Sequence, residues 1–258
     1  MTIEPSTLGS FLLIFVRITS FMVTVPLFSG RQIPAPYKIG LSFVLSILCM
    51  GMVTEPLKDT TEGVYILLIL KEFFVGIVLG FAANILFYSI QLAGSIIDLQ
   101  IGFSMANVFD PNYGMTTNLT GRFKDLLAIL VLLSTNGHHL LIQGILASFD
   151  WISIQNFVPA LTDGQVSSFL LECLKKMFII GFMIATPIIG TLFIVDAALG
   201  IVARTVPQMN IFAVGLPIKV LSYFSIYIII LPSFFYLLNI LFETMFGSMN
   251  SILKLMGA

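Results

Sequence analysis

The chain has two histidines, and they are adjacent, in the run Asn136-Gly137-His138-His139. Histidine is the side chain that most often carries protons or ligates metals near neutral pH. Neighbouring residues on a helix point about 100° apart, so His138 and His139 cannot chelate one ion together. No third histidine and no Cys-His spacing completes a metal site. We therefore predict hydrogen-bonded structural histidines, with no metal and no other cofactor, and a proton role stays open as the alternative.

Catalytic motifs are absent from the sequence. It contains no G-x-S-x-G, no Walker loop, no H-E-x-x-H and no serine-lysine dyad. Cys49 and Cys173 have no CxxC spacing, and we interpret both as packing residues. We therefore predict that the chain is not an enzyme. A membrane enzyme that uses His138 and His139 is the alternative.

Ionisable residues interrupt or flank the apolar runs, where a charge that faces lipid costs a few kcal/mol. They are Arg17, Lys71, Glu72, Asp98, Asp196, Arg204 and Lys219. Adjacent side chains diverge on a helix, so we expect Lys71 and Glu72 to find partners elsewhere. Structural ion pairs between helices are one interpretation, and a proton relay or a conduit wall is the other. For Asp98, Asp196 and Arg204, near segment ends, we expect side chains that reach the membrane interface.

The elements that position these residues must lie in an apolar medium. Of the 258 residues, 58% are hydrophobic and 10% are charged, and the mean hydropathy is +1.05. Membrane lipid or a large apolar partner surface must cover such a chain. The net charge of −1 argues against nucleic acid as a partner. We expect residues 1–258 to form one membrane-embedded domain.

Six apolar segments approach the length of about 20 residues with which a helix crosses a bilayer. They are residues 8–28, 39–53, 64–99, 126–149, 177–195 and 211–242. Residues 64–98 contain no proline and would reach about 52 Å as one helix, against a hydrocarbon core of about 30 Å. Within them, Gly76 and Gly80 form a face that lets another helix approach closely. We predict an all-α, polytopic integral membrane protein.

Four prolines punctuate the last third of the chain, namely Pro187, Pro207, Pro217 and Pro232. Each removes a backbone donor, so we expect broken or kinked helices there. Broken helices at membrane depth are typical of a conduit or an assembly interface. A stand-alone secondary transporter or ion channel, with Lys71, Glu72 and the histidines along its path, fits the same pattern and stays open.

Two stretches resemble the FliR family. Residues 196–219 read DAALGIVARTVPQMNIFAVGLPIK, which is similar to the P-x-[ML]-N-[VI]-F…G-x-P-x-K signature of FliR and its injectisome (SctT) relatives. Residues 94–111, GSIIDLQIGFSMANVFDP, look like the family's segment between its middle helices. Three further features fall in the family's order: Arg17 followed by Pro26-Leu27-Phe28, the Lys71-Glu72 pair, and Asn136-Gly137-His138. The likeness covers nearly the whole chain.

The resemblance implies a subunit of the flagellar type III protein-export gate, in the bacterial inner membrane at the flagellar basal body. Such a subunit assembles with FliP and FliQ, lies next to FlhB, and helps to form the conduit for unfolded flagellar proteins. Members of the family are thought to pack as helical hairpins, like a FliP unit joined to a FliQ unit. Many of their helices pack on other subunits above the membrane plane. The injectisome homologue of this gate shares the same motifs and stays open.

The family places a plug within the pore, in the connection that matches residues 102–113 here. Its residues include Gly102, Phe103, Met105, Val108, Phe109, Asp110 and Pro111. The apolar side chains alternate with residues that form helices poorly. A flexible apolar loop can seal a pore against ions and still yield to an unfolded chain. An ordinary turn between helices is the alternative.

The remaining expected site residues serve assembly. We expect Arg17, Lys71, Glu72 and Lys219 to make polar contacts between helices or subunits. Residues 207–219 should form an assembly-critical bend. That bend contains Pro207, Asn210, Phe212, Gly215 and Pro217.

Overall fold

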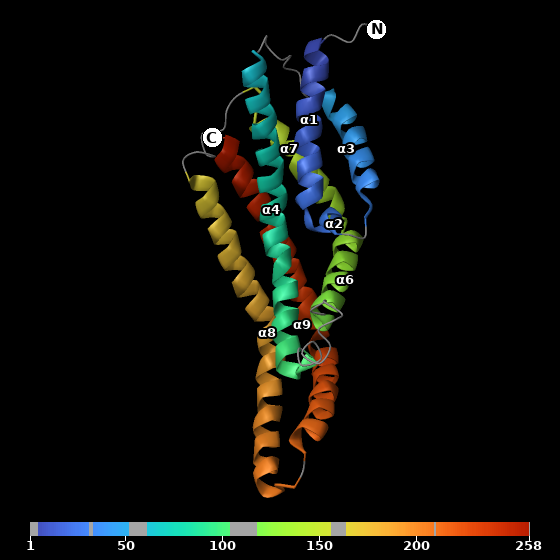
Figure 1. The fold of residues 1–258 in the computed structure, drawn as a ribbon, viewed down its shortest axis with the longest axis vertical. Coiled ribbons are helices and arrows are strands. Elements are labelled where there is room, and N and C mark those ends of the chain that lie inside the picture. Colours follow the sequence, from blue (N-terminus) through green and yellow to red (C-terminus); the bar gives the residue numbers. More distant parts are fainter. Residues whose placement is uncertain are drawn as a thin grey trace. The chain divides into compact units, whose positions relative to one another are not determined.

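A computed structural model describes residues 5–30, 33–51, 61–103, 118–155, 164–208 and 210–257. Every regular element in these ranges is a helix (Figure 1). The helices are α1 (Pro5–Thr24), α2 (Pro26–Ser29), α3 (Ala35–Met50), α4 (Glu62–Ile101), α6 (Leu119–Ser134), α7 (Gly137–Trp151), α8 (Gln165–Thr205) and α9 (Ile211–Gly257). The predicted all-α fold is confirmed.

Prolines set the boundaries at the start of the chain. Val25 is extended, with φ −69° and ψ 141°, because the ring of Pro26 disfavours helical geometry in the residue before it. The expected segment 8–28 is therefore divided into α1 and α2. Pro34 flanks α3 in the same extended conformation, and Pro36 lies in the first turn, where a missing N–H leaves no intrahelical bond unmade.

The expected single segment 126–149 is two helices, α6 and α7, bent by 73° at the break between them. Asn136 takes the left-handed conformation with φ 57°, which asparagine tolerates better than most residues. At Gly137 an added Cβ would meet the side chain of Leu132, so the turn has room only for glycine. The expected segment is therefore a bent pair, because this Asn-Gly pair ends α6 and starts α7.

Three helices are long: α4 has 40 residues, α8 has 41 and α9 has 47. Helical structure continues through Pro187 in α8 and through Pro217 and Pro232 in α9. Pro207 alone among the four prolines lies outside a helix, between α8 and α9. Of the expected breaks or kinks, a break is therefore found only at Pro207, because a long apolar helix tolerates the loss of one backbone donor, and kinks at the other three prolines stay a prediction.

Four helices, α1, α4, α8 and α9, are long and apolar enough to cross a membrane, and the bent pair α6–α7 could form a fifth crossing. Helix α3 has 16 residues, about 24 Å at 1.5 Å per residue, and is shorter than the hydrocarbon core of about 30 Å. Large apolar side chains are exposed on the long helices, such as Phe193 at 67% and Ile229 at 78%. The predicted polytopic membrane protein is confirmed.

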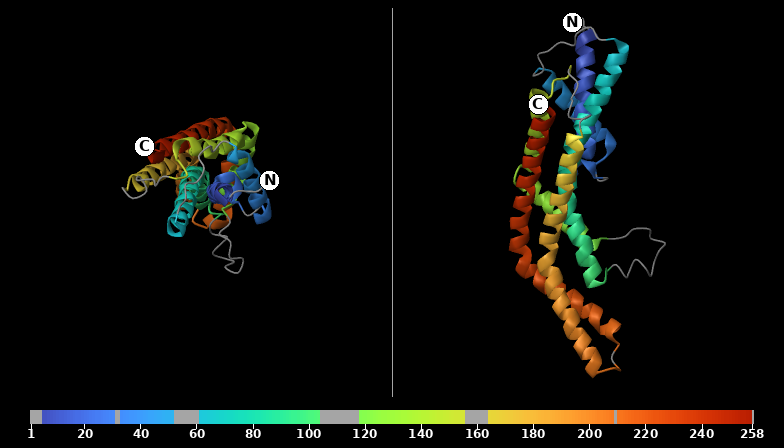
Figure 2. Two further views of the ribbon diagram at one scale, coloured as in Figure 1. Left: turned by 90° about the horizontal axis from the view of Figure 1, so that it is seen from above. Right: turned by 90° about the vertical axis from the view of Figure 1, so that its left-hand side faces the viewer.

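The chain divides into two compact units, to each of which α4, α8 and α9 contribute a part. Unit 1 comprises residues 1–87, 132–175 and 243–258, and unit 2 comprises residues 88–131 and 176–242. In unit 1, α1 runs beside the first part of α4 (Figure 2). An added Cβ on Gly76 or Gly80 would collide with the backbone of α1 around Phe21. The predicted close helix approach at these glycines is confirmed.

Unit 2 contains the rest of α4, all but the end of α6, and a hairpin made by the second part of α8 and the first part of α9 (Figure 2). Helices α4 and α6 touch backbone to backbone at Gly94 and Gly121: a Cβ on Gly94 would overlap the backbone of Gly121, and a Cβ on Gly121 would overlap the side chain of Asn118. Aromatic side chains from α9, including Tyr223, Tyr227 and Phe234, are buried in this unit.

Candidate functional site

Arg17 lies at the centre of unit 1, in α1, with no exposed surface. Its Nε and Nη2 donate to the two carboxylate oxygens of Glu72, and the Nη2 bond measures 2.9 Å. Nη1 donates to the carbonyl and the hydroxyl of Ser148 at 3.0 and 3.2 Å, and Nη2 donates to the carbonyl of Ile152 at 3.0 Å. These contacts engage all five N–H donors of the guanidinium.

Lys71 completes this cluster. Its Nζ lies 2.7 Å from Oε1 of Glu72 and donates to the carbonyls of Ser153 and Ile154 at 2.8 Å each. The expectation that Lys71 and Glu72 would not pair is wrong, because the flexible lysine stem turns back toward its neighbour on α4. Both residues also find partners elsewhere, as expected: Glu72 in Arg17, and Lys71 in these two carbonyls.

The end of α7 is the third side of the cluster. The Ser148 carbonyl lies in the last turn of α7 and also accepts the Ile152 amide at 2.9 Å, whereas the other carbonyls of the cluster follow the helix, at its negative end. Two cations against one carboxylate leave a formal charge of +1, which these carbonyls offset. The ring of Phe149 lies 4.3 Å from Cζ of Arg17 and adds a cation–π contact. The geometry favours an interhelical ion cluster over a proton relay, because every donor of both cations is already engaged.

In unit 2, the signature segment is mostly helix. Pro207 is exposed in the connection, and Asn210 caps α9 by accepting the Ala213 amide on its Oδ1 at 3.3 Å. Phe212 lies in the first turn of α9, Gly215 is buried, and Pro217 is exposed. Residues 211–219 of the expected bend are thus helical.

Asp196 and Arg204, both expected near segment ends, differ in their surroundings. Lys219 lies 2.5 Å, Nζ to Oδ1, from Asp196, so Asp196 is partnered within unit 2, although one third of its side chain is exposed. Arg204 is exposed in the last turn of α8, as expected for a segment end.

The predicted plug begins where α4 ends. Gly102 has φ 101°, a conformation that favours glycine, and its amide donates to the Asp98 carbonyl at 3.1 Å. Phe103 is the last described residue before 118. Met105, Val108, Phe109, Asp110 and Pro111 lie outside the described residues.

The two described ends of this connection are both fixed to α4. The Thr120 amide donates to the Asp98 carboxylate at 3.2 Å, and its hydroxyl donates to the Gly94 carbonyl at 2.9 Å. Asn118 donates to the Gln91 carbonyl at 2.9 Å. Asp98 is only 3% exposed, so the expectation that it reaches the interface is wrong. The positive N-terminus of α6 holds its carboxylate inside the unit instead.

Lys124 is a buried residue that was not predicted from the sequence. It has no exposed surface, and its Nζ lies 5.2 Å from the ring centre of Tyr227 and 6.0 Å from that of Phe234. Nζ has no hydrogen-bond acceptor among the described residues. The available sequence signal was Asn118, because asparagine often caps helices. A helix that starts at Leu119 places Lys124 in its second turn, within the apolar segment.

The histidine and cysteine expectations have mixed outcomes. The rings of His138 and His139 lie 4.1 Å apart, and Nδ1 of His138 is buried without a hydrogen-bond partner in the described part of the chain. The predicted hydrogen bonding is therefore not found at that atom. The described residues contain no group of three His, Cys, Asp or Glu side chains placed to hold a metal ion. Cys49 and Cys173 are buried, as expected of packing residues, and neither forms a disulfide within the described residues.

Comparison with known proteins gives one consistent result. Residues 8–245 match the family described as "Bacterial export proteins, family 1". A protein of Bacillus subtilis (strain 168) named "Flagellar biosynthetic protein FliR" is 42% identical over 248 residues, 96% of each chain. Proteins of the same name from Pectobacterium carotovorum subsp. carotovorum and Escherichia coli (strain K12) are 34% and 28% identical, over 79% and 93% of this chain and 77% and 90% of theirs. The resemblance to the FliR proteins is thus confirmed, and the chain belongs to family 1 of the bacterial export proteins.

Proposed function

We propose that this chain is a subunit of the flagellar type III protein-export gate. The observation that carries the proposal is the 42% identity, over 96% of both chains, to a protein named for flagellar biosynthesis. The flagellar branch is preferred to the injectisome branch because this relative and the other two compared carry flagellar names. The subunit performs no catalysis of its own in this proposal. Its role is to form part of the conduit for unfolded flagellar proteins.

The proposed location is the bacterial inner membrane, at the flagellar basal body. Four or five apolar helices of sufficient length support a membrane location. Within this membrane, lipid covers part of the exposed apolar surface of the long helices.

FliP, FliQ and FlhB are the proposed protein partners, and nucleic acid is not among them. Helices α8 and α9 support an assembly, because apolar side chains are exposed along both of them and each is longer than one bilayer crossing requires. A helix of 41 residues reaches about 61 Å, so part of its apolar surface needs a covering other than lipid hydrocarbon. Subunit contacts provide that covering in this proposal.

The segment 102–113 is the proposed plug. Its support is compositional, since apolar residues alternate with poor helix formers, together with the anchoring of Gly102 and Asn118 to α4 on either side. Deleting residues 103–109 tests the role. The complex should still assemble while the membrane becomes permeable to small ions, and unchanged permeability would count against a seal.

Mild-detergent purification of the tagged chain, expressed with its neighbouring genes, tests the proposed assembly. Mass spectrometry of one large particle should then identify FliP-like and FliQ-like proteins together with this chain. As a control, the exposed Lys254 is replaced by methionine, which should not change the recovered particle. Recovery of this chain alone, as a small uniform particle active in transport, would contradict the proposal and favour a stand-alone transporter.

A further inference from the structure

Three residues of unit 2 form a closed ring of polar contacts. Lys219 Nζ lies 2.5 Å from Oδ1 of Asp196 and donates to the backbone carbonyl of Gln100 at 3.3 Å. The Gln100 side chain donates from Nε2 to the other carboxylate oxygen of Asp196 at 2.9 Å. The three residues come from α9, α8 and α4, so the ring connects three helices.

The Gln100 carbonyl belongs to the last turn of α4. Helix α4 ends at Ile101, and Gly102 with φ 101° turns the chain away. Carbonyls in the last turn of a helix have no intrahelical donor, and a cation beside them is favourable. Lys219 therefore does two things at once: it pairs with Asp196 and caps the C-terminus of α4.

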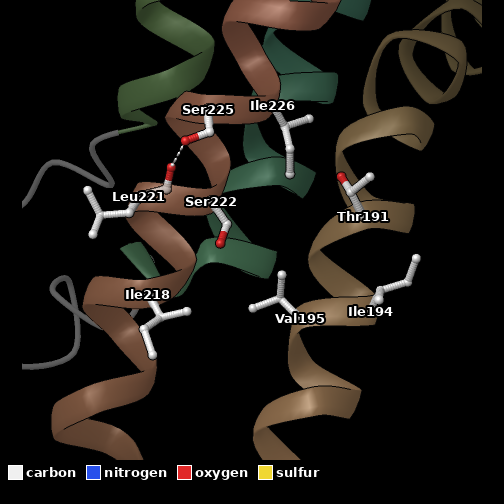
Figure 3. Close-up of a pocket in the computed structure, with 8 residues that line it drawn as sticks. All are labelled: Thr191, Ile194, Val195, Ile218, Leu221, Ser222, Ser225 and Ile226. Atoms are coloured by element: carbon white, nitrogen blue, oxygen red, sulfur yellow. Dashed lines mark hydrogen bonds between the residues drawn. The ribbon is translucent and has the colours of Figure 1, made fainter.

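Little apolar surface is buried between α8 and α9 beside this ring. An open groove of about 480 Å³ separates α8 from α9 there. Figure 3 shows Val195 and Ile218, the sequence neighbours of Asp196 and Lys219, lining this groove. Ile194 and Leu221, also on its wall, are 67% and 69% exposed. Between α8 and α9, the Asp196–Lys219 pair is therefore a specific contact at this level, and on α4 the polar ring adds to the packing of the buried Ile97 and Ile101.

We infer that Gln100, Asp196 and Lys219 form a polar latch that holds the last turn of α4 against the α8–α9 hairpin of unit 2. They are positioning residues, since they act by fixing the point at which the chain leaves α4 at Gly102. The latch itself does not depend on what the protein exports. Its consequence for export rests on the proposed function, in which the segment after Gly102 is the plug.

A distance measurement across the latch tests the inference in the purified complex. Spin labels at L99C and L221C, on exposed positions of α4 and α9, report the separation of these helices by pulsed electron paramagnetic resonance. The native latch should give one narrow distance distribution. Lys219→Met should shift part of the population to longer distances, whereas Lys254→Met, a lysine exposed in unit 1, should leave the distribution unchanged.

Two further variants separate a latch from a simple ion pair. Exchanging the charges, with Asp196→Lys and Lys219→Asp together, keeps an ion pair but sets a carboxylate against the Gln100 carbonyl and an ammonium against its side-chain donor. The exchanged protein should therefore stay in the shifted distribution. Gln100→Leu removes the amide donor alone and should give a smaller shift in the same direction.

Either of two results would overturn the latch: an unchanged distribution in both Lys219→Met and Gln100→Leu, or full recovery of the native distribution by the charge exchange. Swarming motility of the same variants reports on function separately. A shifted distance with unaltered motility would leave the latch standing and count against the proposed role of the segment that it positions.

Discussion

Buried cations occur in both units, and the two units accommodate them differently. In unit 1, Arg17 and Lys71 direct all of their donors to a carboxylate, a hydroxyl and the carbonyls at the end of α7. In unit 2, Lys124 is equally buried, yet its Nζ faces two aromatic rings and lacks a hydrogen-bond acceptor among the described residues. The charges in unit 1 are held by hydrogen bonds, and the charge of Lys124 is held by ring faces and by the electrostatic attraction of Asp98.

The two arrangements stabilise their units to different extents. A buried charge with a complete set of acceptors becomes indispensable, because its removal leaves those acceptors unpaired in an apolar medium. A buried charge held mainly by rings makes weaker contacts, which offset its desolvation less completely. We therefore expect the variants of unit 1 to lose much stability and the variant of unit 2 to lose little.

Arg17→Met should have the largest effect. The substitution leaves Glu72 buried with only Lys71 as a partner and leaves the Ile152 carbonyl unpaired. Breaking a buried ion pair on one side costs about 3–5 kcal/mol of the free energy of unfolding. Denaturation by SDS in mixed micelles, followed by far-ultraviolet circular dichroism, measures this loss.

The double variant Arg17→Met with Glu72→Met provides the control. It removes both charges of the pair, so it should be more stable than Arg17→Met alone. If the double variant is as unstable as the sum of the two single losses, Arg17 and Glu72 do not act as a pair, and the account of unit 1 is wrong.

Lys71→Met should have an intermediate effect. The buried Ile154 carbonyl loses this donor, which costs about 1–3 kcal/mol of the free energy of unfolding, and the part-buried Ser153 carbonyl loses it at a smaller cost. Glu72 keeps the bidentate contact with Arg17, so the loss should be smaller than for Arg17→Met. The same denaturation ranks the two variants, and a larger loss for Lys71→Met would reverse the assigned order.

Much of the fold could be predicted from the sequence, because bilayer-length apolar runs and proline or Asn-Gly punctuation act locally. The long helix α4, which contains no proline, and the close approach at Gly76 and Gly80 could both be predicted directly. The continuity of α8 and α9 did not, because the effect of a proline depends on whether the surrounding helix is held elsewhere. The break at Asn136 was visible as a polar interruption, but its bend of 73° depends on packing around Gly137.

The charged residues of the unit 1 cluster could be predicted from the sequence, but their hydrogen-bond partners could not. Arg17, Lys71 and Glu72 were recognisable because ionisable residues are rare in apolar runs. Their acceptors were not, because Ser148, Ile152 and Ile154 contribute backbone carbonyls that every residue type carries. Asp98 was misassigned for a related reason: the donor that keeps it buried is the amide of Thr120, 22 residues further along the chain.

Lys124→Met should have the smallest effect, and it decides the comparison. Losing the contacts with Tyr227 and Phe234 costs about 0.5–2 kcal/mol, while methionine fills a similar volume and removes the desolvation of a buried ammonium. The two effects oppose each other, so the free energy of unfolding should change by less than about 1 kcal/mol in either direction. Arg122→Met, at an exposed position two residues earlier on the same helix, is the matched control and should be neutral. A loss as large as that of Arg17→Met would mean that Lys124 has an acceptor of its own, such as an internal water shared with Asp98, and that both units hold their cations in the same way.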